Sequence, residues 1–411
     1  MTTAASGPRR VVVTGMGVVS ALGVGAKAHG EGLVEGRDGV GRLEIEDIDR
    51  LAVTQGAQAR AFDGPSLYSR SQIALYDRTT QMALVAAREA VDASGLELDE
   101  AASLRAATVM GTALLGMGTI DDNYRDVFQE GKNRVHPFIV PRLMNSAPVS
   151  FVSMEHGLRG PAFSVSTACS SANHAMGQAF HMVRSGAAEV AVSGGVEAPL
   201  TFGTMKAWEG LRVMTKERCR PFSKGRNGMV LGEGAAVFVF EPLERARARG
   251  AEILGEICGF GMSADAGDIV QPSVDGASRA IRGALQDAGM APEEVGYVNA
   301  HGTGTAANDR TECEAVRQVF GAQAQALVIS STKSMHGHAL GGAGALEMAA
   351  MLQALRTGVL PPTINFLEDD PDCGLNVAPN AAVERPVAAA ISNSFAFGGL
   401  NAVIAARRFD G

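Results

Sequence analysis

Two similar stretches of sequence decide the fold. Residues 163–183 read FSVSTACSSANHAMGQAFHMV, and residues 327–352 read LVISSTKSMHGHALGGAGALEMAAML. Each stretch starts as a short β-branched strand, passes through Ser-Thr into a turn, and continues as a helix of small residues. Because the same unit occurs twice, about 165 residues apart, we expect two similar halves packed face to face, with the chemistry where the two turns meet.

Short strands and longer helices alternate along the rest of the chain, which is typical of an α/β protein with mainly parallel strands. The strand candidates are residues 10–13, 107–110, 190–193, 236–240 and 328–331. The helix candidates are residues 80–94, 171–185, 276–288, 312–320 and 344–356. Since no long linker interrupts this pattern, we divide the chain only into its two halves, residues 1–255 and 256–411.

The composition is that of a folded protein with a large core. Glycine contributes 50 of the 411 residues and charged residues make up 19%, a composition that disfavours a disordered chain. A net charge of −8 without a lysine or arginine block disfavours nucleic-acid binding, which depends on neutralising phosphates. The five cysteines stand singly with no CxxC motif, a pattern that favours a reducing compartment, so we expect a cytoplasmic protein.

Two apolar stretches resemble leader or membrane segments, yet both are expected in the core. Residues 11–26, VVVTGMGVVSALGVGA, carry four glycines and predict a buried strand entering a turn. Residues 387–406 contain no charge, but their asparagines, serines and paired glycines predict strand and loop, not a membrane span. The first stretch also contains G-x-G-x-x-S, in which Ser20 replaces the third glycine of a dinucleotide-binding turn, so a dinucleotide cofactor is disfavoured.

Cys169 is the candidate nucleophile. It stands where a strand ends and a helix begins, so unpaired backbone N–H groups and the helix dipole are expected to lower its pKa and favour thiolate. The alternative is a small buried residue with no chemical role, which is the usual fate of a lone cysteine.

Three histidines lie in glycine-rich turns that follow predicted strands: His301, His336 and His338. Strand C-termini are where α/β proteins place their sites, so these turns point to chemistry. Zinc is the alternative, but the spacing of the histidines and Cys169 matches no common zinc pattern, and we expect no metal. Lys333 stands nearby in apolar surroundings and needs a carboxylate partner, either Glu312 or Glu347.

Four motifs taken together, TACSSA, HGTGT, KSMHGH and NSFAFGGLNA, resemble the β-ketoacyl-[acyl carrier protein] synthases of the thiolase superfamily. The resemblance runs from about Arg9 to about Ala405 and is greatest for the synthase II type, which includes nodulation-type synthases and the ketosynthase subunits of type II polyketide systems. It implies a thiolase-like α/β fold, with two similar halves in a five-layered α-β-α-β-α core. Residues 1–255 would be the half with the nucleophile, and residues 256–411 the half with the histidines and a gating loop.

The resemblance implies an acyltransferase that condenses an acyl group on Cys169 with malonyl-[acyl carrier protein] and releases CO₂. His301 and His338 would stabilise the enolate, and the backbone N–H groups of Cys169 and Phe397 the tetrahedral oxyanion. Lys333, with Glu312 or Glu347, would hold the loops. No cofactor is expected beyond the phosphopantetheine arm that carries the substrates.

Two alternatives remain open. A chain-length partner subunit of a polyketide heterodimer is disfavoured because such subunits usually lack the nucleophile that Cys169 supplies. An acyl-CoA thiolase is disfavoured because thiolases use a second cysteine, whereas this chain presents one cysteine with two histidines.

The resemblance also assigns substrate-binding residues. Phe397 would gate the acyl pocket, and Thr303 and Thr305 would contact the pantetheine arm. The far end of the pocket would be shaped by Ala113, Leu114, Thr204, Trp208 and, across a dimer interface, Ile139. Trp208 replaces a phenylalanine of the family pattern, and Ala396 replaces the glycine before the gate, so the pocket and the gate are expected to differ from those of relatives.

The expected partner is an acyl carrier protein. Such carriers are acidic and this chain is itself negative, so docking requires a local basic patch, for which the candidates are Arg70, Lys132, Arg134, Lys206 and Arg212. We expect a homodimer, with a heterodimer containing a ketosynthase-like partner subunit as the alternative.

Overall fold

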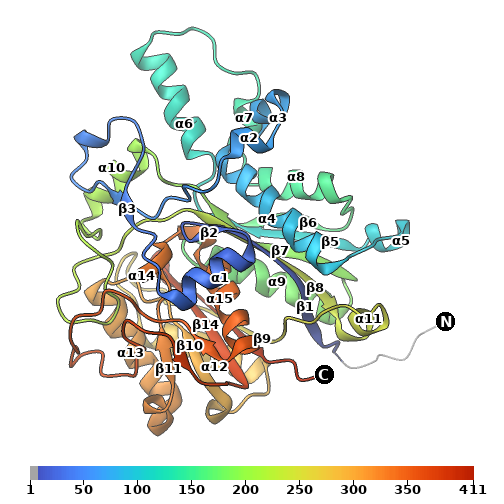
Figure 1. The fold of residues 1–411 in the computed structure, drawn as a ribbon, viewed down its shortest axis with the longest axis vertical. Coiled ribbons are helices and arrows are strands. Elements are labelled where there is room, and N and C mark those ends of the chain that lie inside the picture. The colour runs from blue at the N-terminus through green and yellow to red at the C-terminus, as the bar shows by residue number, and fades with distance from the viewer. Residues whose placement is uncertain (1–7) are drawn as a thin grey trace.

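The structure is a computed structural model that describes residues 8–411. Its main feature is one large mixed sheet of eleven strands, in the order β11-β10-β14-β15-β9-β1-β8-β7-β5-β6 with β2 beside β1 (Figure 1). The strands of this sheet are β1 (Val11–Ser20), β2 (Gly23–Val24), β5 (Ala106–Gly111), β6 (Ala162–Val165), β7 (Val190–Glu197), β8 (Gly234–Pro242), β9 (Gly255–Ala264), β10 (Val295–Asn299), β11 (Val328–Ser330), β14 (Ala389–Ala396) and β15 (Leu400–Arg407). Two short hairpins pair β3 (Gly41–Arg42) with β4 (Gln55–Gly56), and β12 (Val359–Leu360) with β13 (Val383–Glu384).

The strand order repeats from one half to the other, which confirms the predicted duplication. Without β2 and the hairpin strands, the first half contributes five strands to the sheet, which are β1, β5, β6, β7 and β8 in chain order. Across the sheet they lie in the order third, second, fourth, fifth, first, as β6-β5-β7-β8-β1. The second half likewise contributes β9, β10, β11, β14 and β15, and these lie in the same order, as β11-β10-β14-β15-β9. The halves join where β1 and β9 pair over three residues. β9 begins at Gly255, beside the division at residues 255 and 256, which itself stays a prediction.

The expectation of a mainly parallel sheet is wrong. Four pairings in the large sheet are parallel, namely those of β5 with β6 and β7 and those of β10 with β11 and β14. The other six are antiparallel. A strand buried on both faces reads as a continuous apolar run in either direction, so the sequence pattern does not distinguish the two.

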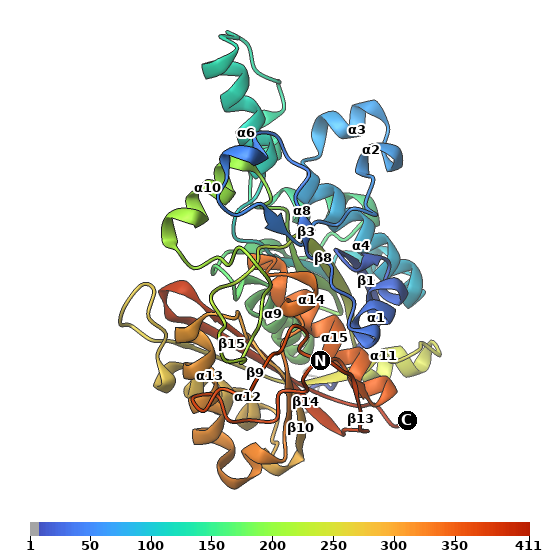
Figure 2. The ribbon, with the colours of Figure 1, turned by 60° about the vertical axis from the view of Figure 1, so that its left-hand side comes forward.

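Helices form three layers around the two half-sheets (Figures 1 and 2). α9 (Ser171–Ser185) and α15 (Ala343–Thr357) lie between the halves, because each contacts strands of both. α4 (Arg78–Ser94) and α8 (Ala147–His156) cover the outer face of the first half, and α12 (Val274–Asp287) with α13 (Ala306–Phe320) cover that of the second. The five layers of the predicted fold are therefore present.

The remaining helices are short, and several lie at the edges of these layers. They are α1 (Ala26–Glu35), α2 (Gly64–Leu67), α3 (Arg70–Leu75), α5 (Glu100–Ser103), α6 (Met117–Tyr124), α7 (Ile139–Leu143), α10 (Phe202–Leu211), α11 (Leu243–Ala248) and α14 (Lys333–His336). α6 and the segment that follows it project from one end of the molecule in both views (Figures 1 and 2).

The glycines of the G-x-G-x-x-S stretch lie inside a strand and not in a turn. β1 continues unbroken from Val11 to Ser20, so the turn comes later than the sequence suggested. A Cβ added at Gly15 or Gly17 would collide with the carbonyl oxygen of Ala90 or Ala86 on α4. These glycines allow a helix to approach a strand closely, which accounts for them without a dinucleotide.

The uncharged stretch near the C-terminus forms the hairpin of β14 and β15, as predicted, with both strands buried. Of the helices within residues 8–411, none combines the length and the apolar character that crossing a bilayer requires.

Candidate active site

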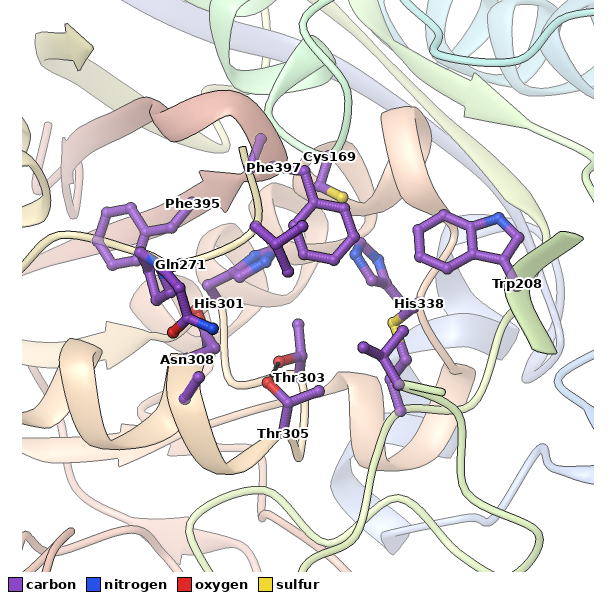
Figure 3. Close-up of a pocket in the computed structure, with 16 residues that line it drawn as sticks. Cys169, Trp208, Gln271, His301, Thr303, Thr305, Asn308, His338, Phe395 and Phe397 are labelled. Carbon is purple, nitrogen blue, oxygen red and sulfur yellow. Dashed lines mark hydrogen bonds between the residues drawn. The ribbon is translucent and has the colours of Figure 1, made fainter. Parts of the chain in front are cut away.

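The two strand-to-helix turns meet at a cavity of about 170 Å³ (Figure 3). Seven of the predicted site residues line it: Cys169, Trp208, His301, Thr303, Thr305, His338 and Phe397. Cys169 comes from the first half of the chain and both histidines from the second, and the three side chains point toward one another (Figure 3). The sequence repeat thus predicted correctly which turns come together.

A tight turn presents Cys169 to the cavity. Ala168 has a left-handed backbone with φ of 50°, which is unusual for a residue with a side chain. The hydroxyl of Ser171 donates to the carbonyl of Ala168 over 2.6 Å and accepts from the N–H of Thr167 over 2.9 Å. α9 begins at Ser171, so the sulfur lies just before the first turn of the helix.

The expectation of a lowered thiol pKa is wrong. Burial raises the pKa of Cys169 to about 12 and outweighs the charge of Lys333 and hydrogen bonds from the backbone of Phe397 and of Cys169 itself, all of which favour thiolate. The thiol is therefore protonated at neutral pH, and a reaction at the sulfur needs a group that accepts its proton.

His301 and His338 are neutral. Their ring centroids lie 5.4 Å apart with the rings nearly perpendicular, at 85°. Burial first, and then the positive charge of Lys333, hold the pKa of each histidine well below its usual range. The Nδ1 atoms of both rings are buried without a hydrogen-bond partner among the described residues. A neutral imidazole offers one N–H donor and one acceptor nitrogen, so each ring can stabilise a developing negative charge or accept a proton.

Two buried carboxylates have different roles beneath the histidines. Glu347 forms the ion pair with Lys333, and both side chains are completely buried. Glu312 instead accepts hydrogen bonds from the backbone N–H groups of His301 and Gly302, each over 2.8 Å. The question left open by the sequence is settled, since Glu347 is the partner of Lys333 and Glu312 holds the loop of His301.

His336 does not line the cavity. Its Nε2 lies 2.9 Å from the hydroxyl of Thr332 and its Nδ1 lies 2.9 Å from the carbonyl of Gly337, so both ring nitrogens are occupied. No group of three or more histidine, cysteine, aspartate or glutamate side chains within residues 8–411 has a geometry that could hold a metal ion.

The loop that carries Phe397 is tied to a second loop. The three-residue turn Phe397–Gly399 joins β14 to β15, and its two glycines have left-handed φ values of 80° and 68°. The N–H of Gly398 donates to the carbonyl of Ile269 over 2.8 Å, and the N–H of Asp265 donates to the carbonyl of Gly399 over 2.9 Å. Two backbone hydrogen bonds therefore hold the turn of Phe397 against residues 265–273.

Trp208 lies beside Phe397 and lines the cavity that contains Cys169. Its indole is stacked on the ring of Phe397, with centroids 5.9 Å apart and planes 22° apart. Ala113 and Leu114 pack in the same apolar cluster as Trp208 and Cys169 but do not line the cavity. Thr204 is buried within α10, and Ile139 is half-buried on α7; neither lines the cavity.

Sequence reasoning missed Glu197, a buried carboxylate that joins two parts of the site. It accepts hydrogen bonds from the backbone N–H groups of Ala113, Leu114 and Gly341, over 2.6, 3.1 and 3.1 Å. Burial raises the pKa of Glu197 to about 7. Gln271 and Asn308, which line the cavity, were also missed. Nothing in the local pattern marks Glu197, because its partners are 83 to 144 residues away along the chain.

The five basic docking candidates are all exposed, but they differ in pairing. Lys132 lies 2.7 Å from Asp126 and 2.8 Å from Glu130, and Lys206 lies 2.9 Å from Glu209. Within the described part of the chain, Arg70, Arg134 and Arg212 form no salt bridge, so their charges remain available to a partner.

Comparison with known proteins identifies the family. The sequence profile of the β-ketoacyl synthase N-terminal domain matches residues 8–246, and that of the C-terminal domain matches residues 254–367. Nodulation protein E of Rhizobium sp. (strain N33) is 46% identical over 400 residues, which cover 97% of this chain and 99% of the relative. The 3-oxoacyl-[acyl-carrier-protein] synthase 2 of Staphylococcus aureus (strain COL) is 37% identical over 409 residues, with 98% and 99% covered.

Solved structures lead to the same family. The ishigamide ketosynthase/chain length factor has a TM-score of 0.93 and 36% identity, and the match covers 98% of this chain and 100% of that one. A type II polyketide ketosynthase solved in complex with its acyl carrier protein has a TM-score of 0.89 and 30% identity, with the same coverage. From the profile matches, the relatives and the shared fold, this chain belongs to the β-ketoacyl synthase family of acyltransferases.

Proposed function

We propose that the protein catalyses the decarboxylative condensation of an acyl thioester, held on Cys169, with malonyl-[acyl carrier protein] in fatty acid or polyketide chain elongation. The products are β-ketoacyl-[acyl carrier protein] and CO₂. The observation that carries this proposal is that one cavity brings together a buried thiol and two neutral imidazoles. Family membership supports the same reaction.

In the first step, the sulfur of Cys169 attacks the carbonyl carbon of the acyl thioester. Because the thiol is protonated at neutral pH, its proton passes to a neutral imidazole and then to the departing pantetheine thiolate. The acyl group is then a thioester of Cys169, and the carrier leaves with a free thiol.

In the second step, malonyl carrier protein loses CO₂ and becomes an enolate. His301 and His338 each donate an N–H to the enolate oxygen, since both rings are neutral and face the cavity. Removing one donor of this kind typically lowers the rate by a factor of about 10²–10³.

In the third step, the enolate carbon attacks the carbonyl of the acyl group on Cys169. The oxyanion that forms accepts hydrogen bonds from the backbone of Cys169 and Phe397, the groups that already act on the sulfur. Collapse of this intermediate forms the new C–C bond and expels the thiolate, which takes a proton from water.

An acyl carrier protein is the proposed partner, and the phosphopantetheine arm the only carrier group that the reaction needs. Thr303 and Thr305 would contact the arm, because both line the cavity. Arg70, Arg134 and Arg212 are the first candidates for docking. Similarity to a ketosynthase solved with its carrier protein supports this assignment.

A dimer is also proposed. Large apolar side chains are exposed around α6 to α8 and on the edge strand β6, among them Phe128 at 78%, Met154 at 73% and Val140 at 65% exposure. Exposed large apolar side chains that gather on neighbouring elements favour association. We propose a homodimer, with pairing to a second ketosynthase-like chain as the alternative, and a location in the cytoplasm.

The decisive experiment separates condensation from decarboxylation. Cys169→Ala is expected to abolish formation of β-ketoacyl carrier protein, measured by mass spectrometry, while CO₂ release from malonyl carrier protein remains measurable. Cys258→Ala, which removes a thiol elsewhere in the chain, is the matched control and should retain both activities. Elongation by Cys169→Ala at a rate near that of the wild type would disprove the mechanism.

Two further comparisons address the alternatives. A thiolase would use an acetyl donor, so condensation with malonyl but not acetyl thioesters supports the proposal. A chain-length partner subunit would acquire no acyl group on Cys169, which intact-mass measurement detects directly.

A further inference from the structure

The single tryptophan of the chain is stacked on the ring that lies beside the nucleophile. The indole of Trp208 and the ring of Phe397 are 5.9 Å apart at 22°, within the range of stable offset stacking. The backbone of Phe397 also acts on the sulfur of Cys169, where it favours the thiolate and lowers the pKa of the thiol. Figure 3 shows both rings at the cavity that contains the sulfur.

The cavity reaches only part of the apolar cluster that contains Trp208. Trp208 and Phe397 line it, whereas Ala113, Leu114 and Met205, which pack in the same cluster as Trp208, do not. An acyl group larger than the cavity therefore has to displace part of the cavity lining, which includes the two stacked rings.

The ring of Phe397 is the movable part of this arrangement. Its turn is tied through the backbone, since Gly398 donates to Ile269 and Gly399 accepts from Asp265. The ring itself makes no hydrogen bond, and its aromatic neighbour within residues 8–411 is the indole. Rotation of such a side chain requires only the loss of the stack and of apolar contacts.

We infer that Trp208 is a positioning residue for the gate: its indole holds Phe397 across the acyl channel and thereby favours acyl groups that fit the cavity over longer ones. This inference rests on the proposed function, because it concerns acyl groups on Cys169. A single aromatic stack shifts an equilibrium between two ring positions by roughly two- to tenfold. Loss of the stack should therefore change the preference of the enzyme for short over long acyl groups by a factor of this size.

A double-mutant cycle tests the inference. The measured quantity is the ratio of the rate constants for acylation of Cys169 by dodecanoyl-pantetheine and by butyryl-pantetheine, followed by intact mass. Trp208→Leu and Phe397→Leu should each raise this ratio by roughly two- to tenfold, and the double variant should raise it no further. Trp208→Phe keeps an aromatic ring and should give a ratio close to that of the wild type.

Three outcomes would overturn the inference. The ratio could stay unchanged in Trp208→Leu, as expected if the indole only packs and affects both acyl groups equally. The two single substitutions could act additively, or Trp208→Phe could fail to restore the ratio.

Tryptophan fluorescence gives a second test that needs no substitution at Trp208. Because the chain contains one tryptophan, its emission reports on this stack alone. Acylation with dodecanoyl should change the emission spectrum, acylation with butyryl should not, and Phe397→Leu should abolish the difference. Equal spectra of the two acyl-enzymes contradict the inference. Failure to form any acyl-Cys169 would instead count against the proposed function, so the two failures are distinguishable.

Discussion

Lys333 and Glu347 form an ion pair in which neither side chain is exposed to solvent. The pair joins α14, which precedes His338, to α15, one of the two helices between the halves. The charge of Lys333 also lowers the pKa of both His301 and His338. One buried pair therefore contributes to both the position and the neutrality of the histidines.

Removing one charge of this pair should destabilise the protein strongly. Glu347→Gln leaves the ammonium group of Lys333 buried without a counter-charge, and an uncompensated buried charge lowers the free energy of unfolding by about 3–5 kcal/mol. Urea denaturation measures this loss. Glu252→Gln removes the partner of Arg356 in an exposed pair and should change the same quantity by less than about 1 kcal/mol. Equal effects of the two substitutions would contradict the account given for Lys333.

The reactivity of Cys169 should rise with pH well beyond the range of an ordinary thiol. Its pKa is raised to about 12, so the thiolate fraction in the free enzyme increases about tenfold for each pH unit between pH 7 and pH 10. The rate of alkylation by iodoacetamide, followed by the mass of the peptide that contains Cys169, should increase accordingly without a plateau. An exposed thiol levels off above about pH 8.5. A plateau at or below that pH would show that the thiolate is stabilised in the free enzyme.

Glu312 should influence decarboxylation more than acylation. Each oxygen of its carboxylate accepts one backbone N–H, from His301 and from Gly302, and the amide of Glu312→Gln has only one acceptor oxygen. The resulting shift of His301 is expected to lower kcat for malonyl decarboxylation by about 10²-fold, since misplacement of a catalytic group by about 1 Å has an effect of this size. Acylation of Cys169, measured by intact mass, should fall much less. Equal losses in both steps would indicate a general loss of structure.

The turn that carries Phe397 requires glycine at position 399. A Cβ there would lie 2.5 Å from the Cβ of Asp265, and the φ of 68° is already unfavourable for a residue with a side chain. Gly399→Ala should therefore displace the turn that carries Phe397 and slow acylation of Cys169. Gly157→Ala is the matched control, because Gly157 has a φ of 62° with nothing within 4 Å of an added Cβ. Gly157→Ala should lose about 1 kcal/mol of stability and keep its acylation rate, whereas Gly399→Ala should lose more stability and also acylation rate.

Local patterns predicted the main helices well, because helical period and end signals are contained within each segment. Residues 171–185 form a helix with the predicted bounds, and the helices predicted at residues 80–94 and 344–356 are each longer by at most two residues at either end. The direction of the strands could not be read in the same way, since apolar strands buried on both faces look alike in either direction. The glycines of β1 were ambiguous for a related reason, as only α4, some 70 residues later, explains them.

The sequence by itself pointed to Cys169, to His301 and His338, and to the duplication that brings them to one cavity, because each is encoded in a short motif at the end of a predicted strand. Only the tertiary structure decided that Glu347, not Glu312, pairs with Lys333, that Trp208 stacks on Phe397, and that the thiol pKa is raised. Pairing and stacking depend on which residues the fold brings into contact over long sequence separations. The pKa of Cys169 depends on burial, which raises it. The lowering expected from the helix N-terminus could be inferred from the local sequence, but the effect of burial is larger.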